Sequence, residues 1–250
     1  MDPERTKEHL SQIHTLWTTV RRAHGGSASA AAQLRLLERY GAAIRRYLRG
    51  ALRDPDAAEE VFQEFVFRFL RGDFRRADPD RGRFRDFLKT ALYRLVVDHQ
   101  RQNRRWPEPL TADGPEPADP EDAASALDRE FLAVWREALL GYAWEALGEH
   151  DRRTGQILSL VLRFHIEHPK VRSPEAARQL GARLGKALSP EWVRKWLARA
   201  RRQFADLFLD EVARSIQDPR PESLEQELVE LGLLDACRPA LERRRESILS

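Results

Sequence analysis

The chain has 250 residues, of which 42% are hydrophobic and 33% are charged, and its formal net charge is +3. This length and composition fit one or two folded domains and exclude a chain that is disordered throughout. No apolar run approaches the roughly 20 residues of a membrane span, and the start MDPERTKEHL lacks the layout of a signal peptide, so we expect a cytoplasmic protein without membrane insertion.

Helical periodicity dominates the chain, and no strand-like alternation occurs. The predicted helices cover residues 30–52, 56–71, 84–102, 127–147, 152–165, 173–184 and 189–216. This pattern predicts an all-α protein with two helical domains joined by a Pro-rich acidic linker, the C-terminal domain containing a helix-turn-helix. The expected parts are an N-terminal extension (1–29), a first domain (30–106), the linker (107–124), a second domain (125–217) and a C-terminal tail (218–250).

The helix predicted at 56–71 has two distinct faces. One face is the apolar stripe that a core-facing helix needs; it consists of Val61, Phe62, Phe65, Val66 and Phe69. The other face carries Glu60, Gln63, Glu64 and Phe67 at spacings i, i+3, i+4 and i+7, so an aromatic ring lies within a polar stripe. This combination suggests a surface that docks a partner, although a solvated face with one exposed ring is the simpler interpretation.

The stretch 84–105 (FRDFLKTALYRLVVDHQRQNRR) begins apolar and ends basic. Its polar end consists of Arg94, Asp98, His99, Arg101, Gln102, Asn103, Arg104 and Arg105. Arginines neutralise phosphates, and amide and imidazole groups can read base edges, so a nucleic-acid surface is a candidate here. Basic helix ends are also common on proteins that never bind DNA.

Five prolines and six acidic residues follow between residues 106 and 124, without any Lys or Arg. The prolines oppose a regular helix, and the like charges should extend the segment, which is therefore interpreted as the linker.

Two similar helix starts, Ser173-Pro174-Glu175 and Ser189-Pro190-Glu191, predict a helix-turn-helix, with each Ser as the N-cap. The second helix has an inward stripe and an outward cationic face around Ala198, where a small side chain would let the backbone approach a DNA groove. The cations are Arg194, Lys195, Arg199 and Arg202. An amphipathic surface helix is the alternative interpretation.

These motifs, in this order, resemble the alternative sigma factors of the sigma-70 family, of the small two-domain extracytoplasmic-function (ECF) type. Family members have sequences such as DAEDLVQEVFLRLW, then FRAWLxxIARNLAIDHxRRRRR, then a linker and a four-helix domain ending in a helix-turn-helix. Here DAAEEVFQEFVFRFL, FRDFLKTALYRLVVDHQRQNRR and SPEAARQLG with SPEWVRKWLARARRQF fill those positions. The resemblance covers residues 30–216 and implies that 30–106 is region-2-like and 125–217 region-4-like.

The resemblance also implies roles for these residues. Glu60, Gln63, Glu64 and Phe67 would bind the β′ clamp of core RNA polymerase. The polar end of 84–105 would bind the promoter −10 element, with Arg94 standing where the family often has Asn. Arg194, Lys195, Arg199 and Arg202 would read the −35 element, and the acidic linker would run through the polymerase channels. The implied function is recruitment of polymerase to promoters and assistance with −10 melting, in the nucleoid, with an anti-sigma factor or other regulator as a further candidate partner.

We expect no enzyme, metal site or cofactor. Cys237 is the sole cysteine, the seven histidines lack matched catalytic partners, and no Gly-rich phosphate loop occurs. The sequence HIEH at 165–168 is interpreted as a helix end rather than as a metal-binding pair.

Two other functions remain open at this point. A stand-alone helix-turn-helix regulator would bind duplex DNA without polymerase, but it leaves the Glu60 to Phe67 face unexplained. A sigma-like protein that has lost DNA binding would agree with Arg94 and with the segment from Gly181 to Leu188, a turn longer than is usual in a helix-turn-helix, but not with the cationic faces. The tail could cover a DNA-binding face, bind a regulator, or simply pack on the C-terminal helices.

Overall fold

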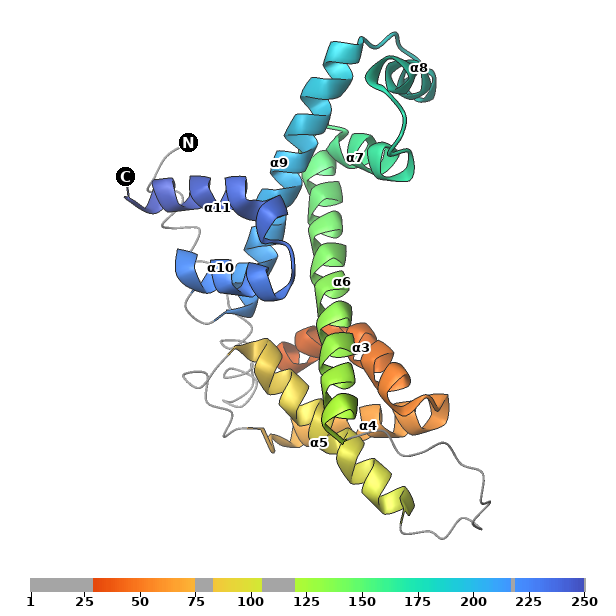
Figure 1. Cartoon of the computed structure of the whole chain (residues 1–250), viewed down its shortest axis with the longest axis vertical. Helices are drawn as coiled ribbons and strands as arrows, with labels where there is room; N and C mark the ends of the chain where they lie inside the picture. The colour runs from red at the N-terminus through yellow and green to blue at the C-terminus, as the bar shows by residue number, and fades with distance from the viewer. Residues whose placement is uncertain (1–28, 75–82, 105–119, 217–218, 250) are drawn as a thin grey trace. The chain divides into compact units, whose positions relative to one another are not determined.

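The structure is a computed structural model that describes residues 29–74, 83–104, 120–216 and 219–249 (Figure 1). All regular elements in these ranges are α-helices, which confirms the all-α prediction. Within them, contacts separate two compact units: residues up to 138 with 213–223, and residues 139–212 with 224–249. None of the described helices is both long and apolar enough to cross a membrane.

The first unit contains α3 (Ser29–Leu52), α4 (Pro55–Arg71), α5 (Phe84–Arg104) and the beginning of α6 (Pro120–Thr154). The inward stripe predicted for α4 is buried, apart from the half-buried Val66. The apolar residues Phe84, Leu88, Leu95 and Val96 of α5 are buried as well. An aromatic cluster joins α3 to α6, because the rings of Tyr40 and Trp135 stack with their centroids 5.1 Å apart. Packing of the apolar stripes therefore holds α4 and α5 in place.

The second unit contains the rest of α6, then α7 (Leu158–Glu167), α8 (Ser173–Leu184), α9 (Pro190–Ser215) as far as residue 212, α10 (Pro221–Glu230) from residue 224, and α11 (Leu234–Leu249). One core cluster joins α7, α8 and α9 through Phe164, Leu180 and Val193. A second cluster joins α6, α7 and α9 through Leu147, Leu162 and Ala200. These clusters fix α9 against three other helices while its opposite side stays exposed.

The junction between α6 and α7 differs from the helices predicted at 127–147 and 152–165. The predicted helix 152–165 is wrong at its start, since α6 continues to Thr154 and α7 begins at Leu158. Gly155 has φ +70°, a left-handed conformation that ends α6. The side chain of Asp151 then accepts hydrogen bonds from the amides of Leu158 (3.0 Å) and Ser159 (2.8 Å), and this starts α7.

The predicted linker 107–124 lies outside the described residues as far as 119. Its last part is helical, because α6 begins at Pro120. Proline is well tolerated at the first position of a helix, where its missing N–H would have no partner in the helix. The expectation that prolines oppose a helix through residue 124 is therefore wrong for the residues from Pro120 onward.

The C-terminal tail forms α10 and α11, and α11 contacts the second half of α9. Arg243 of α11 donates a hydrogen bond to Asp206 of α9 (2.6 Å), and Arg244 of α11 forms an ion pair with Asp210 of α9. Within the tail, Arg245 pairs with Glu225. These contacts agree with packing of the tail on the C-terminal helices.

Candidate functional site

Helix α4 begins and ends with strong local signals. The Asp54 carboxylate accepts hydrogen bonds from the amides of Asp56 (2.9 Å) and Ala57 (3.2 Å), and Pro55 follows it as the first helical residue. Gly72 closes the helix in the left-handed region at φ 85°. These caps fix the length of α4, and burial of its apolar stripe sets which face points outward.

The outward stripe of α4 has the composition predicted from the sequence. Glu60, Gln63 and Glu64 are exposed, and Phe67 is 56% exposed. The guanidinium carbon of Arg71 lies 5.2 Å from the Phe67 ring centroid, and Arg68 pairs with Glu64 at 2.5 Å. A large exposed ring framed by polar groups is the composition of an anchor in a protein interface.

A groove of about 650 Å³ lies beside this stripe, between α4 and α5. Its α4 wall contains the four predicted residues together with Val61 and Arg68, and its α5 wall contains Leu95, Asp98, His99 and Gln102. Two sets of residues assigned to different partners at the sequence level therefore line one groove.

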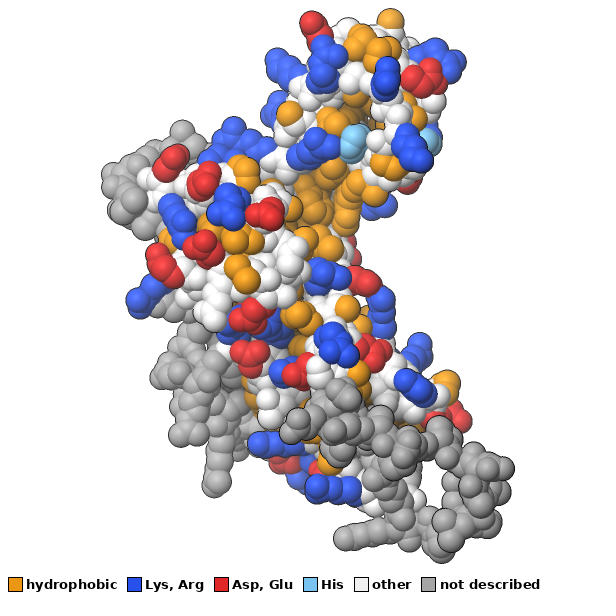
Figure 2. All heavy atoms as spheres, viewed as in Figure 1, with side chains coloured by type: hydrophobic (Ala, Val, Ile, Leu, Met, Phe, Trp, Pro, Cys, Tyr) orange, Lys and Arg blue, Asp and Glu red, His pale blue; other side chains and the backbone are white. Residues whose placement is uncertain are grey.

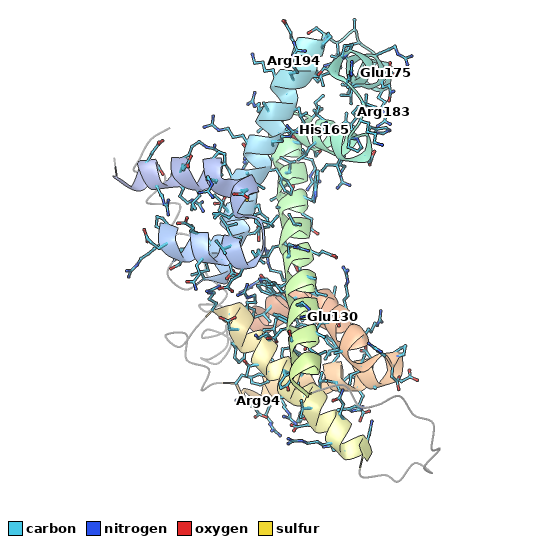
Figure 3. All side chains as sticks on the ribbon, viewed as in Figure 1. Arg94, Glu130, His165, Glu175, Arg183 and Arg194 are labelled. Carbon is cyan, nitrogen blue, oxygen red and sulfur yellow. The ribbon has the colours of Figure 1, made fainter. Side chains whose placement is uncertain are left out.

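The polar end of α5 divides between the groove and the surface outside it. Arg94, Arg101 and Asn103 are exposed and do not line the groove. His99 is half-buried, and its Nε2 lies 2.9 Å from the side-chain nitrogen of Asn103. Arg105 and the side chain of Arg104 lie outside the described residues. Figure 3 labels Arg94 on α5.

The turn between α8 and α9 is tight and depends on two glycines. Gly185 has φ 63°, and the Lys186 amide donates to the Gly181 carbonyl at 3.0 Å. Gly181 is buried against the turn, where a Cβ would come within 2.7 Å of the Lys186 carbonyl oxygen. The turn thus lets α9 cross close to the end of α8.

The two predicted N-caps behave differently. The Ser189 hydroxyl accepts a hydrogen bond from the Trp192 amide at 3.0 Å, so this cap is confirmed. The cap predicted at Ser173 is wrong, because α8 begins at Ser173 itself and no side chain caps it. The preceding residue, Arg172, occupies the cap position, and an arginine side chain has no acceptor to offer.

The predicted cationic face of α9 is exposed. Arg194, Lys195, Arg199 and Arg202 all reach solvent, as does the small Ala198 among them. Figure 2 shows Lys and Arg side chains over α7, α8 and the start of α9. Figure 3 labels Arg194 on α9, and Arg183 and Glu175 on α8. The tail contacts α9 further along, at Asp206 and Asp210, so it leaves these four cations uncovered.

An aromatic pair on α9 supports this face and was missed in the sequence. Trp192 and Trp196 stack with centroids 5.1 Å apart. The ammonium of Lys186 lies 5.7 Å from the Trp192 ring, and the guanidinium of Arg199 lies 5.7 Å from the Trp196 ring. The i, i+4 spacing of the two tryptophans was the signal that could have revealed this arrangement. The contacts limit the positions that Lys186 and Arg199 can adopt.

The histidines at the end of α7 have structural contacts. His165 Nε2 lies 2.6 Å from a guanidinium nitrogen of Arg201, and burial together with this neighbouring charge lowers the pKa of His165. His168 follows the last residue of α7, and its ring donates to the Phe164 carbonyl at 3.0 Å. This confirms HIEH as a helix end. Across the described part of the chain, no cluster of three metal-ligating side chains occurs.

Comparison with known families gives a match, in the segment that contains α4 and α5. Residues 36–105 match the Sigma-70 region 2 family, a segment that includes all of α4 and α5. No curated protein and no solved structure was found to match the chain. Both walls of the groove therefore lie within the segment that matches the Sigma-70 region 2 family.

Proposed function

We propose that the chain is a sigma factor that binds core RNA polymerase, directs it to specific promoters and assists opening of the −10 element. The match of residues 36–105 to Sigma-70 region 2 carries this proposal. Proteins of this kind recruit an enzyme without catalysing a reaction, in agreement with the absence of any catalytic constellation in the sequence. The chain would then act by binding polymerase and promoter DNA in the cytoplasm.

The outward stripe of α4 is the proposed polymerase contact. Phe67 would act as the apolar anchor, while Glu60, Gln63 and Glu64 would orient the partner through charge and hydrogen bonds. Exposure of the ring supports this role, since burying a half-exposed phenylalanine at an interface contributes favourable free energy.

The basic end of α5 is the proposed −10 contact, acting on a separated strand. Arg94 and Arg101 are exposed cations there, and cations that follow a strand backbone lower the cost of opening it. Extrusion of a base costs a few kcal/mol, which pocket contacts would offset without ATP.

The cationic face of α9 is the proposed −35 contact, on duplex DNA. Ala198 would allow close approach, and the surrounding Arg194, Lys195, Arg199 and Arg202 would neutralise phosphates or read bases. Assignment to the ECF type, passage of the acidic linker through polymerase, and binding of an anti-sigma factor are further parts of this proposal.

Binding to core RNA polymerase tests the proposal. Purified chain should form a complex with core enzyme in size-exclusion and pull-down runs, and a folded Gln63→Ala, Glu64→Ala, Phe67→Ala variant should lose it. If the wild-type chain does not bind polymerase but does bind duplex DNA, the stand-alone helix-turn-helix regulator is the better function, because the exposed cations of α9 would serve either protein.

A further inference from the structure

The stripe of α5 that lines the groove repeats the spacing of the stripe of α4. On α4 the positions are Glu60, Gln63, Glu64 and Phe67, and on α5 they are Leu95, Asp98, His99 and Gln102, both at i, i+3, i+4 and i+7. Residues at these spacings share one face of a helix. The groove is therefore built from one complete face of each helix.

The charges of these walls disfavour a nucleic acid as the occupant. Glu60, Glu64 and Asp98 contribute three carboxylates, while the arginine that lines the groove, Arg68, is already paired with Glu64. Phosphates would be repelled here, whereas a cationic protein segment would be attracted. No described residue forms an ion pair with Asp98 or Glu60 across the groove.

Two exposed arginines of α5, Arg94 and Arg101, lie outside this wall. Taking 100° per residue, Arg94 and Arg101 fall on one side of α5, and neither lines the groove. One helix thus offers an acidic, amide-bearing face to the groove and a cationic edge outside it. Assigning the entire polar end of α5 to DNA would place the Asp98 carboxylate, which no described residue pairs with, on a surface that binds phosphates.

We infer that Asp98, His99 and Gln102 form the second wall of the polymerase-binding site, and that the occupant of the groove is a cationic segment of core RNA polymerase. This inference rests on the proposed function. It reassigns these three residues from the DNA-binding surface to the polymerase-binding surface. Arg94 and Arg101 remain with the promoter. Asp98 would pair with an Arg or Lys of the polymerase segment, Gln102 would hydrogen-bond beside it, and Phe67 would pack against its aliphatic part.

The arrangement has a consequence for α5 itself. Leu95 and Val96 are buried, but the residues after Asp98 are mostly exposed, so the end of the helix has little packing of its own. A polymerase segment in the groove would contact α5 over Asp98 to Gln102 and hold this end. Polymerase binding would then position Arg101 for DNA through the same helix.

The test compares dissociation constants of full-length variants for core RNA polymerase at one fixed salt concentration. Asp98→Lys should weaken binding by about tenfold or more, as reversal of a paired interfacial charge does, and the milder Asp98→Asn and Gln102→Ala should weaken it by about threefold. The matched control is Gln100→Ala on the same helix, an exposed residue that does not line the groove, which should bind polymerase within about twofold of wild type. Circular dichroism and melting temperature establish that each variant is folded.

A second readout separates protein binding from DNA binding. With polymerase saturated, Arg101→Ala holoenzyme should bind a single-stranded −10 oligonucleotide more weakly than wild type, whereas Asp98→Asn holoenzyme should match wild type. If the wild-type chain and the α4 triple variant behave as proposed but Asp98→Lys binds polymerase like wild type, this inference is overturned and the proposed function stands. Failure of the wild-type chain to bind polymerase overturns both.

Discussion

Gly181 lies where the end of α8 meets the chain entering α9. A methyl group there would stand 2.7 Å from the Lys186 carbonyl oxygen, a backbone atom that cannot swing aside. Gly181→Ala should therefore force the turn open and lower the free energy of unfolding by about 1–3 kcal/mol, the usual cost of overpacking. Urea denaturation followed by circular dichroism measures this change.

The control for this substitution is Gly141→Ala in α6, where an added Cβ meets nothing within 4 Å. Alanine is the better helix former, so this variant should gain about 0.5–1 kcal/mol. Equal effects from the two substitutions would contradict the argument from the tight turn.

Cys237 should be chemically inert in the folded protein. Burial, together with the nearby Asp206 carboxylate, raises the pKa of its thiol to about 11, and the side chain is 4% exposed. At pH 8 only about one molecule in a thousand carries the reactive thiolate, and reagent must still reach it. Thiol labelling of native protein should therefore be slower by orders of magnitude than labelling in urea. Comparable rates in the two states would show that α11 opens readily from α9.

At the scale of elements, the α6–α7 junction depends on one carboxylate. Asp151 near the end of α6 accepts from two backbone amides of α7 and from the Ser159 hydroxyl at 2.6 Å. Asp151→Ala leaves those donors without their acceptor and should destabilise the fold by about 1–2 kcal/mol, as loss of an N-cap does. Thermal and urea unfolding measure the change.

A matched carboxylate elsewhere separates this role from charge alone. Asp235 pairs with Arg238 at 3.2 Å, and its side chain is 97% exposed. Asp235→Ala should change the free energy of unfolding by less than about 0.5 kcal/mol, since exposed ion pairs contribute little. If both alanine variants had the same stability, the capping account of Asp151 would be wrong.

Helix extents were largely predictable from the sequence, because burial of one stripe requires a 3.6-residue period. The bounds of α4, α8 and α9 follow from that period with Pro and Gly near their ends. The break at Gly155 was missed, since glycine within a helical pattern need not end a helix, and the compensating bonds come from Asp151, before the break.

The candidate site was predictable one helix at a time, but the groove was not. Periodicity places Glu60 and Phe67 on one face of α4, and Asp98 and Gln102 on one face of α5. Their meeting depends on how the two helices pack against each other. This packing brings Val61 and Leu95, 34 positions apart in the chain, to the same groove, and no local pattern contains that information. For this reason the sequence analysis assigned Asp98 to the same nucleic-acid surface as the arginines near it in the chain.

At the scale of the whole molecule, the distribution of charge should determine how salt affects DNA binding. The net charge is only +3, so attraction to DNA must come from local faces such as the exposed cations of α9 rather than from the molecule as a whole. Each phosphate contact contributes a slope of about −0.9 to a plot of log K against log salt concentration.

Lys195→Ala and Arg202→Ala should therefore each reduce the magnitude of that slope by about one when the isolated chain binds a duplex of random sequence. Fluorescence anisotropy across a salt series measures it. The control is Arg238→Ala on α11, an exposed arginine that pairs with Asp235. If net charge alone attracted DNA, the magnitude of the slope would fall by the same amount in all three variants. If α9 is the DNA face, Arg238→Ala keeps the wild-type slope, and only the two α9 variants have a smaller one.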